Sequence, residues 1–416
     1  MPIAVICTGS ELLKGGCCNT NMQLLGAELA ARAMIPVLEL SVPDHPDKLY
    51  HAIACALQKA DTLIISGGLG PTSDDITLET VCRFFALACI TVPELKEKVE
   101  YFWSLRHKGH CPTFQYKQAM IPAGSKYIHN PSGVASGISF QTVYGGKMRH
   151  IYLLPGPPGE FEAVLHNGML EDIAANYGDD RQFTAGFLIY GTGESVVARR
   201  VEPLLKELPV EIAYTAGAYG TRIYLTAKEP DLPERALAIV AGAFPDNHLA
   251  PGCFDLPSAL LEKLRSQNKT VCCAESCTGG LVADTLVNMP GVSAFFAGGI
   301  VAYANAVKEQ LLGVSAEILL DHGAVSPECA IAMADGACRV LKCDCAVSTT
   351  GIAGPDGGTP EKPVGLVYIA ASADGKNSVQ ELRLRGSRRM IREKAVAAAM
   401  ILLYKLLKNE GSETGC

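Results

Sequence analysis

A serine and a cysteine stand side by side in the stretch ESCTGG at residues 275–280. The residues before it, TVCCA, are apolar and rich in β-formers, and the residues after it, LVADTLVNM, have apolar side chains at helical spacing. A turn between a strand and a helix can expose Ser276 as a nucleophile beside backbone N–H groups that stabilise an oxyanion. The alternative is that Ser276 or Thr278 only caps the helix, and this stretch taken alone favours the cap.

A lysine with apolar neighbours lies in the stretch GGIVAYANAVKEQLLGV at 298–314. The spacing predicts a helix capped by Asn305, in which Lys308 shares one face with Ala304, Leu311 and Leu312. An inward lysine can run its stem along apolar surface and keep its amine in water. If it is buried instead, desolvation lowers its pKa and makes it a general base, so a Ser–Lys pair becomes possible.

Two further stretches can contribute to the same site. The loop TTGIAGPDGGTPEKPVG at 349–365 follows an apolar strand and is rich enough in glycine to bring backbone N–H groups close to a ligand. The stretch RLRGSRRMIREK at 383–394 places Arg388 and Arg389 at the start of the last helix. These arginines either bind a phosphate or carboxylate or form a solvated face, and the sequence leaves both possibilities open.

Near the other end of the chain, SGGLGPTSDDIT at 66–77 directly follows the apolar strand TLIIS. Glycines after a strand and acids before a helix are typical of a phosphate-binding loop with metal-binding carboxylates. The loop has neither a GK[ST] ending nor a GxGxxG pattern. Asp74 and Asp75 could equally serve only to complement the helix dipole.

Composition limits the class of protein. The chain has 416 residues, 48% of them hydrophobic and 19% charged, with a net charge of −7, which is typical of a folded multidomain protein and not of a general nucleic-acid binder. Its 16 cysteines form no CxxC pair, and the N-terminus has no secretory pattern, so we expect reduced thiols and a cytoplasmic protein. The apolar run at 395–404 is about half the roughly 20 residues that cross a bilayer, so we expect no membrane partner.

The order of predicted elements indicates an α/β fold. Strands at 3–7, 37–42 and 62–66 alternate with helices, which is typical of a mainly parallel, doubly wound sheet. At about 183–248 the order of strands and helices changes, which indicates a small α+β unit. A linker rich in proline and glycine follows, and a third α/β unit begins near Pro257.

The motifs of the third unit resemble the CinA C-terminal domain. ESCTGG, GGIVAYANAVKEQLLGV, HGAVS, TTGIAGPDGGTPEKPVG and RGSRRMIREK occur in the family's order, and we place the domain at 256–410. The resemblance implies an amidohydrolase that converts nicotinamide mononucleotide (NMN) to nicotinate mononucleotide and ammonia, without a cofactor. It implies catalytic roles for Ser276 as nucleophile, Lys308 as base, Tyr303 and Arg388, and substrate contacts from Thr278, Gly279, Gly280, Thr350, Gly351, Gly354 and Gly357. The family usually has aspartate where this chain has Ser387.

The first unit, at 1–177, resembles the molybdopterin-binding-type domain of full-length CinA proteins. The resemblance is carried by TGSELLKGGCCNTN, VPDHPDKL, SGGLGPTSDDIT, YKQAMIPAG and LLPGPPGEF. It implies hydrolysis of ADP-ribose to AMP and ribose 5-phosphate with a divalent metal held by Asp44, Asp75 and Glu11. The matching substrate-binding positions are Gly67, Gly68, Gly70, Pro71, Thr72, Lys117 and Glu160. A domain that binds a pterin or nucleotide without cleaving it is the alternative.

The middle unit, at 178–250, lies where CinA proteins have a KH-like domain. Its only GxxG candidate, GAYG at 217–220, lies between two predicted strands and has no adjacent lysine. KH domains hold RNA on a GxxG loop between helices, so we expect no nucleic-acid binding here. The unit is then a spacer or a dimerisation element, and the resemblance implies a homodimer.

Overall fold

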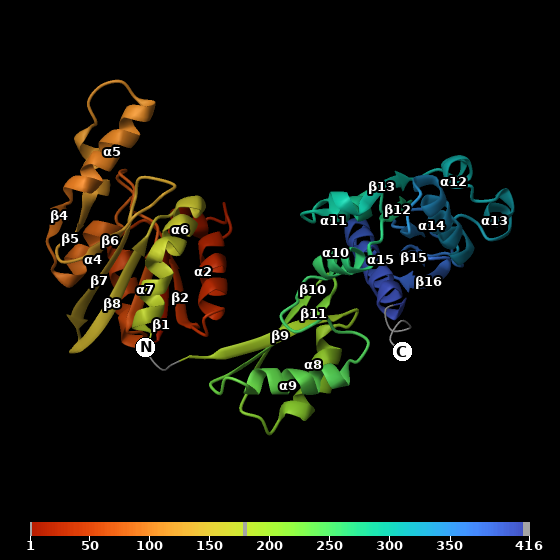
Figure 1. Ribbon diagram of the computed structural model, residues 1–416, viewed down its shortest axis with the longest axis horizontal. Helices are drawn as coiled ribbons and strands as arrows, with labels where there is room; N and C mark the ends of the chain where they lie inside the picture. The colour runs from red at the N-terminus through yellow and green to blue at the C-terminus, as the bar shows by residue number, and fades with distance from the viewer. Residues whose placement is uncertain (1, 178–180, 411–416) are drawn as a thin grey trace. The chain divides into compact units, whose positions relative to one another are not determined.

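The computed structural model describes residues 2–177 and 181–410, with side chains to Lys408. It forms two compact units, Met1–Thr184 with Lys228–Pro230, and Ala185–Ala227 with Asp231–Cys416 (Figure 1). Each unit is described by itself below. No helix in the described part of the chain is both long and apolar enough to span a membrane.

The first unit is built on a six-stranded sheet. In spatial order its strands are β2 (Pro36–Val42), β1 (Ile3–Thr8), β3 (Thr62–Ser66), β8 (Lys147–Leu154), β7 (Gly137–Tyr144) and β6 (Lys126–Ile128). The first four are parallel, whereas β7 and β6 pair antiparallel. The mainly parallel sheet expected from the apolar strands is therefore confirmed, with an antiparallel edge that the pattern did not indicate.

Helices cover both faces of this sheet because alternate side chains of its strands point to opposite sides. The helices are α1 (Ser10–Leu13), α2 (Thr20–Ala30), α3 (Pro46–Lys59), α4 (Thr77–Phe85), α5 (Pro93–Arg106), α6 (Pro158–Val164) and α7 (Leu170–Asn176). Ala4 and Ile6 pack with α3, α4 and α5 in one core, and Ile3 and Val5 pack with α2, α6 and α7 in another. A short pair of strands, β4 (Cys89–Thr91) and β5 (Met120–Pro122), flanks α5.

The second unit begins with a three-stranded sheet in the order β10 (Glu211–Gly217), β11 (Gly220–Ala227) and β9 (Phe183–Tyr190), with helices α8 (Glu194–Leu205) and α9 (Leu232–Ala243). Gly217 pairs with Gly220 across the β10–β11 hairpin. The GAYG stretch is thus a turn between strands, as expected. The KH-like character of this part stays a prediction. Tyr190 and Leu249 join the core of the larger sheet of the same unit.

That larger sheet has the order β13 (Phe296–Val301), β12 (Val271–Glu275), β14 (Cys345–Gly351), β15 (Leu366–Ala373) and β16 (Lys376–Arg383). β12 is parallel to β13 and β14, and the last two strands are antiparallel. The helices α10 (Leu256–Gln267), α11 (Leu281–Val287) and α15 (Arg388–Glu410) pack with one core, and α12 (Asn305–Leu312), α13 (Ala316–Asp321) and α14 (Pro327–Leu341) pack with the other. The expected α/β class is confirmed here too.

Local sequence explains where several helices begin. The side chains of Asp255 and Ser326 accept hydrogen bonds from the backbone N–H groups of Ser258 and Cys329 at the start of α10 and α14. Ser387 does the same for Met390 at 3.3 Å, and α15 begins at Arg388, so Arg388 and Arg389 lie at the start of the last helix as expected. An aspartate, the usual family residue at this position, could cap the helix in the same way.

Candidate active site

The carboxyl ends of the parallel strands β13, β12 and β14 surround a cavity of about 220 Å³. Ligands of open α/β sheets bind at such strand ends, where neighbouring connections leave in opposite directions. The cavity is lined by Ser276, Cys277, Tyr303, Asn305, Lys308, Ala324, Val325, Thr350, Gly351, Ala353 and Arg388. Segments far apart in the sequence thus meet at one small site.

Ser276 and Lys308 are hydrogen-bonded to each other. Lys308 Nζ lies 3.2 Å from Ser276 Oγ, and the lysine side chain is only 1% exposed. The inward orientation expected for Lys308 is confirmed. The face predicted for it is only partly right, because Leu312 is buried and Leu311 is 53% exposed. Asn305 is the first helical residue and makes no capping bond, so its side chain lies at the cavity instead.

The amine of Lys308 makes three hydrogen bonds inside the unit. Nζ contacts the carbonyl oxygens of Ala302 at 2.9 Å and Tyr303 at 3.2 Å, and its third contact is Ser276. Carbonyl oxygens only accept, so Nζ donates to both of them, and Nζ also donates to Ser276 Oγ. Burial lowers the pKa of Lys308, because desolvation disfavours its charged form.

Cys277, the rival nucleophile, is also buried at this cavity. Burial raises the pKa of its thiol to about 11, which the opposing effect of Arg392 does not offset. The thiolate is the reactive form of cysteine, so Cys277 is protonated and weakly nucleophilic near neutral pH. Lys308 Nζ is hydrogen-bonded to Ser276 Oγ, so the geometry of the site favours the hydroxyl of Ser276.

Arg388 and Tyr303 form the mouth of the cavity. Arg388 Nη1 donates to the carbonyl oxygen of Gly354 at 2.6 Å, and Nη2 donates to Tyr303 Oη at 3.2 Å. Tyr303 is 62% exposed. Arg389 instead pairs with Glu393 on the helix surface at 2.7 Å. Of the two possibilities that the sequence left open, Arg388 lies at the site and Arg389 lies on a solvated face.

The glycine-rich loop is tied to the opposite wall of the cavity. Thr350 Oγ1 donates to the carbonyl oxygen of Ala324 at 2.6 Å. Lys362 Nζ donates to those of His322 at 2.6 Å and Val325 at 2.8 Å. These three bonds hold the segment 322–325 against the loop, a contact that no local pattern in the sequence indicates.

Several residues assigned to substrate binding serve the turns around the cavity and do not line it. Thr278 is fully buried and bonds to Thr349 Oγ1 at 2.6 Å. Gly279 and Gly280 have φ values of +58° and +99°, which permit the turn after Ser276. Gly354 accepts the bond from Arg388, and Gly357 is exposed. Asn305, Ala324, Val325 and Ala353 line the cavity without having been singled out as site residues, and of these only Asn305, a polar residue at a helix start, offered a signal.

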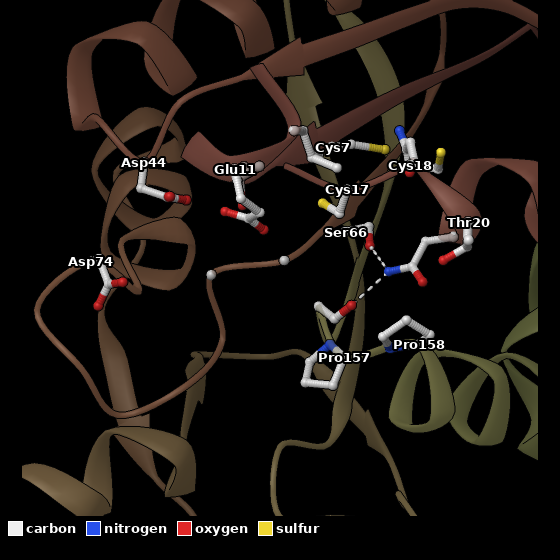
Figure 2. Close-up of a pocket in the computed structure, with 18 of the residues that line it drawn as sticks. Cys7, Glu11, Cys17, Cys18, Thr20, Asp44, Ser66, Asp74, Pro157 and Pro158 are labelled. Carbon is white, nitrogen blue, oxygen red and sulfur yellow. Dashed lines mark hydrogen bonds between the residues drawn. The ribbon is translucent and has the colours of Figure 1, made fainter. Parts of the chain in front are cut away.

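A larger cavity of about 580 Å³ lies in the first unit, where β1, β2, β3 and β8 end (Figure 2). Glu11, Asp44, Asp75, Gly67 and Gly68 line it, as do Cys17, Cys18, Asn21, Asp74 and the segment 156–158. Asn21 Nδ2 donates to Ser66 Oγ at 3.1 Å and to the carbonyl oxygen of Gly156 at 2.7 Å. Asn21 thus joins the ends of β3 and β8 across the cavity.

The acids of this cavity do not form a ready metal centre. Asp44 accepts a bond from the backbone N–H of Ser10 at 2.8 Å, and Asp75 accepts two from Thr72, at 2.9 and 2.5 Å. Within the described residues, no three His, Cys, Asp or Glu side chains converge on one point. α4 begins at Thr77 without a side-chain cap, so Asp74 and Asp75 do not cap it.

The remaining predicted residues of the first unit lie elsewhere. Pro71, Thr72 and Lys117 line a separate, open depression, and Lys117 pairs with Glu79 at 2.9 Å. Gly70 supports the loop, because a Cβ there would overlap the carboxylate of Asp75. Glu160 accepts a bond from Asn130 Nδ2 at 2.7 Å and lines a third cavity of about 250 Å³. Thr72 and Lys117 nevertheless contact Asp75, since Thr72 donates to its carboxylate and Lys117 Nζ donates to its carbonyl oxygen, whereas Glu160 lines a different cavity.

Comparison with known proteins gives a family match for the segment that contains each cavity. Residues 254–407 match the family model of the CinA C-terminal domain, and residues 4–175 match that of the probable molybdopterin binding domain. A relative from Dictyoglomus thermophilum, described as a CinA-like protein, is 35% identical over 422 residues that cover 98% of this chain and all of the relative. The chain belongs to the CinA family.

Other members of the CinA family are similarly close. A relative from Moorella thermoacetica, a competence-damage inducible protein by name, is 37% identical over 416 residues, which cover 98% of this chain and 99% of the relative. Among solved structures, that of the competence/damage inducible protein CihA from Agrobacterium tumefaciens is 41% identical and covers 37% of this chain and 93% of its own, with a TM-score of 0.36. Both named relatives of this CinA-family chain are matched over nearly their whole length.

Proposed function

We propose that the second unit hydrolyses the carboxamide of NMN with Ser276 as nucleophile and Lys308 as general base. The observation that carries this proposal is the buried Lys308 amine 3.2 Å from Ser276 Oγ, with both of its other contacts to carbonyl oxygens. A carboxamide is a poor electrophile with a poor leaving group. Its hydrolysis needs an activated nucleophile and a proton donor for the leaving nitrogen, and this pair supplies both.

In the proposed mechanism, neutral Lys308 takes the proton of Ser276 as Oγ attacks the carboxamide carbon. The resulting ammonium of Lys308 returns that proton to the nitrogen, the C–N bond breaks, and ammonia leaves an acyl-serine ester. Water then attacks the ester while Lys308 accepts its proton, and Ser276 is regenerated as nicotinate mononucleotide leaves. Each proton removed is returned by the same amine, so the cycle is balanced.

The shape of the site suits one end of a nucleotide. A cavity of about 220 Å³ suits a single aromatic ring, so the nicotinamide would enter and the ribose phosphate would extend through the mouth. Arg388 lies at that mouth with Tyr303 and can bond to anionic oxygens. Asn305 is an additional polar side chain for the carboxamide, since an amide both donates and accepts hydrogen bonds.

The direct test is release of ammonia and nicotinate mononucleotide from NMN by the full chain in the presence of EDTA. We expect turnover that EDTA leaves unchanged, because each proposed step uses only side chains and water. Free nicotinamide and nicotinamide riboside serve as comparison substrates without the phosphate. An enzyme that leaves NMN intact in both EDTA and divalent metal would refute the proposal.

A cysteine substitution tests the choice of nucleophile. We expect Cys277→Ser to keep NMN turnover within about fivefold of the parent, because its buried thiol is protonated at the working pH. Initial rates of ammonia release at saturating NMN measure this. A loss of a hundredfold or more, with Ser276→Ala still active, would move the nucleophile to Cys277.

A second activity is favoured by the acidic cavity of the first unit, and we propose that it hydrolyses the pyrophosphate of ADP-ribose to AMP and ribose 5-phosphate. Its glycine loop and carboxylates line one cavity of about 580 Å³, large enough for a nucleotide. These hard oxygen donors suit Mg²⁺, which binds through one or two carboxylates and substrate phosphates. Because the described residues contain no preformed set of three ligands, Asp44 and Asp75 would hold a cation only together with the substrate phosphates, where it would supply charge neutralisation.

An acid substitution tests this second activity. We expect Asp75→Asn to lower AMP formation from ADP-ribose in Mg²⁺ by at least about a hundredfold, since its carboxylate also holds the loop at Thr72. Asp47→Asn, on the surface of α3, is the matched control. A parent that retains a pterin through purification and hydrolyses no ADP-ribose would instead identify the first unit as a binding module.

A further inference from the structure

A buried carboxylate, Glu275, directly precedes Ser276 and has no role in the mechanism above. Glu275 is 1% exposed, and both of its oxygens accept backbone hydrogen bonds. Oε2 accepts from the N–H groups of Gly280 at 2.9 Å and Val282 at 3.0 Å, and Oε1 accepts from that of Ala283 at 2.8 Å. The carboxylate therefore binds the first turn of α11 at three points.

These bonds explain how a charge can lie in the core. A buried carboxylate is costly unless hydrogen bonds compensate for its lost water, and the first N–H groups of a helix lack partners within the helix. The carboxylate of Glu275 provides acceptors for these N–H groups, and the N–H groups replace the water that the carboxylate has lost. Such charge-assisted hydrogen bonds are stronger than neutral ones. As a result, the amides of the first turn of α11 are occupied. An oxyanion formed at Ser276 would therefore use other backbone N–H groups than those of Gly280, Val282 and Ala283.

Glu275 also closes the turn that carries Ser276. The side chain reaches Gly280, five residues ahead, so residues 276–279 form a loop whose ends are joined. Gly279 and Gly280, both with positive φ, give the backbone the freedom that this closure needs. The N–H of Ser276 donates to the carbonyl oxygen of Thr349 at 2.9 Å, which fixes the loop against β14.

The backbone of Glu275 reaches the lysine of the pair as well. Its carbonyl oxygen accepts from the N–H of Ala302 at 2.8 Å, and the carbonyl oxygen of Ala302 accepts from Lys308 Nζ at 2.9 Å. Ser276 is covalently next to Glu275. One residue is therefore connected to both partners, to Ser276 through the chain and to Lys308 through Ala302.

We infer that Glu275 is a positioning residue of the Ser276–Lys308 pair, holding the serine within reach of the amine by binding the start of α11. The inference rests on the proposed amidase function. It assigns to Glu275 no contact with substrate. Positioning residues of this kind typically change activity by about 10- to 100-fold when altered, and misplacement of a nucleophile by about 1 Å can cost a hundredfold.

The variant Glu275→Gln tests the inference with little change in shape. A glutamine has one accepting oxygen and one donating NH₂, so it can keep the bonds to Gly280 and Val282 but not the one to Ala283. We expect kcat for NMN to fall at least about tenfold with KM unchanged within twofold. The matched control is Asp255→Asn, which alters the N-cap of α10 in the same unit, away from the cavity. It should leave kcat at the parent value.

A second readout needs no NMN turnover. Labelling of Ser276 by phenylmethylsulfonyl fluoride, followed by peptide mass, reports the reactivity of the serine itself. We expect Glu275→Gln to slow labelling at least tenfold in the full chain. A parent that is labelled at Ser276 but does not turn over NMN would contradict the proposed substrate, and the labelling rates of the variants would still decide the role of Glu275.

Two outcomes would overturn the inference. One is a Glu275→Gln variant with parental kcat and labelling rate. The other is a kcat reduced only in proportion to the folded fraction, as measured by circular dichroism, which would make Glu275 merely structural. If Glu275→Gln does not fold, Glu275→Asp keeps the charge on a shorter side chain. Its labelling rate should then lie below the parent's, and an unchanged rate would count against the inference.

Discussion

The substitutions Ser276→Ala and Lys308→Met are each expected to lower kcat for NMN by at least about a thousandfold. The serine supplies the attacking oxygen and the lysine supplies the proton acceptor 3.2 Å from it. The double variant should be no slower than the worse single variant, because residues that act as one unit lose their joint contribution once. Single-turnover ammonia release distinguishes these rates from the background.

Matched surface changes control for general damage to the unit. Ser266→Ala and Lys263→Met lie on α10, away from the cavity, and should keep parental rates. Ser276→Ala should also keep the KM of the parent within a fewfold, because the cavity and its mouth remain. Residual activity of a tenth or more in Lys308→Met would show that another group takes the proton.

The dependence of kcat/KM on pH should follow the ionisation of Lys308. Burial lowers the pKa of Lys308 below the ordinary 10.5 of lysine, and only the neutral amine can accept a proton. Activity is therefore lost as pH falls through this lowered pKa, by about tenfold for each unit below it, and it reaches a plateau on the alkaline side before pH 10.5. Initial rates in buffers of constant ionic strength measure the inflection.

The same pH profile of kcat/KM distinguishes a mechanism that depends on the Lys308 amine from one that depends on the Cys277 thiolate. Burial raises the pKa of Cys277 to about 11, so a mechanism that uses its thiolate would still be gaining activity above pH 10.5. The Cys277→Ser profile should superimpose on that of the parent. An inflection that moves in this variant would contradict the assignment to Lys308.

Much of the proposed site could be predicted because its residues lie next to clear elements. Ser276 follows an apolar strand and Lys308 interrupts an apolar face, although the stretch around Ser276 taken alone favoured a helix cap. The sequence pattern did not show which apolar side chains of α12 are buried. Leu311 and Leu312 are equally apolar, yet only Leu312 is buried, since burial depends on where α14 packs against α12.

The sequence also could not predict side-chain hydrogen bonds between residues that lie far apart in the chain. In the sequence, Glu275 is an ordinary acidic residue at the end of a strand. Its neighbours in the sequence do not indicate that its carboxylate accepts hydrogen bonds from the start of α11. Likewise, Glu160 belongs to a motif of the first unit but bonds to Asn130, and Lys117 bonds to Glu79 and to the carbonyl oxygen of Asp75 without lining the acidic cavity. A motif thus shows roughly where a site lies in the chain, but tertiary packing determines which of its side chains line the cavity.

The two units have separate sheets, each with its own cores, and this bears on how the protein melts. Proteins of several domains commonly lose cooperativity between them, so heating should give two calorimetric transitions and not one. A ligand stabilises only the part that binds it, in proportion to the logarithm of its concentration over Kd. An unreactive NMN analogue should then raise one transition and ADP-ribose the other, so that calorimetry would assign each nucleotide to its unit without any measurement of turnover.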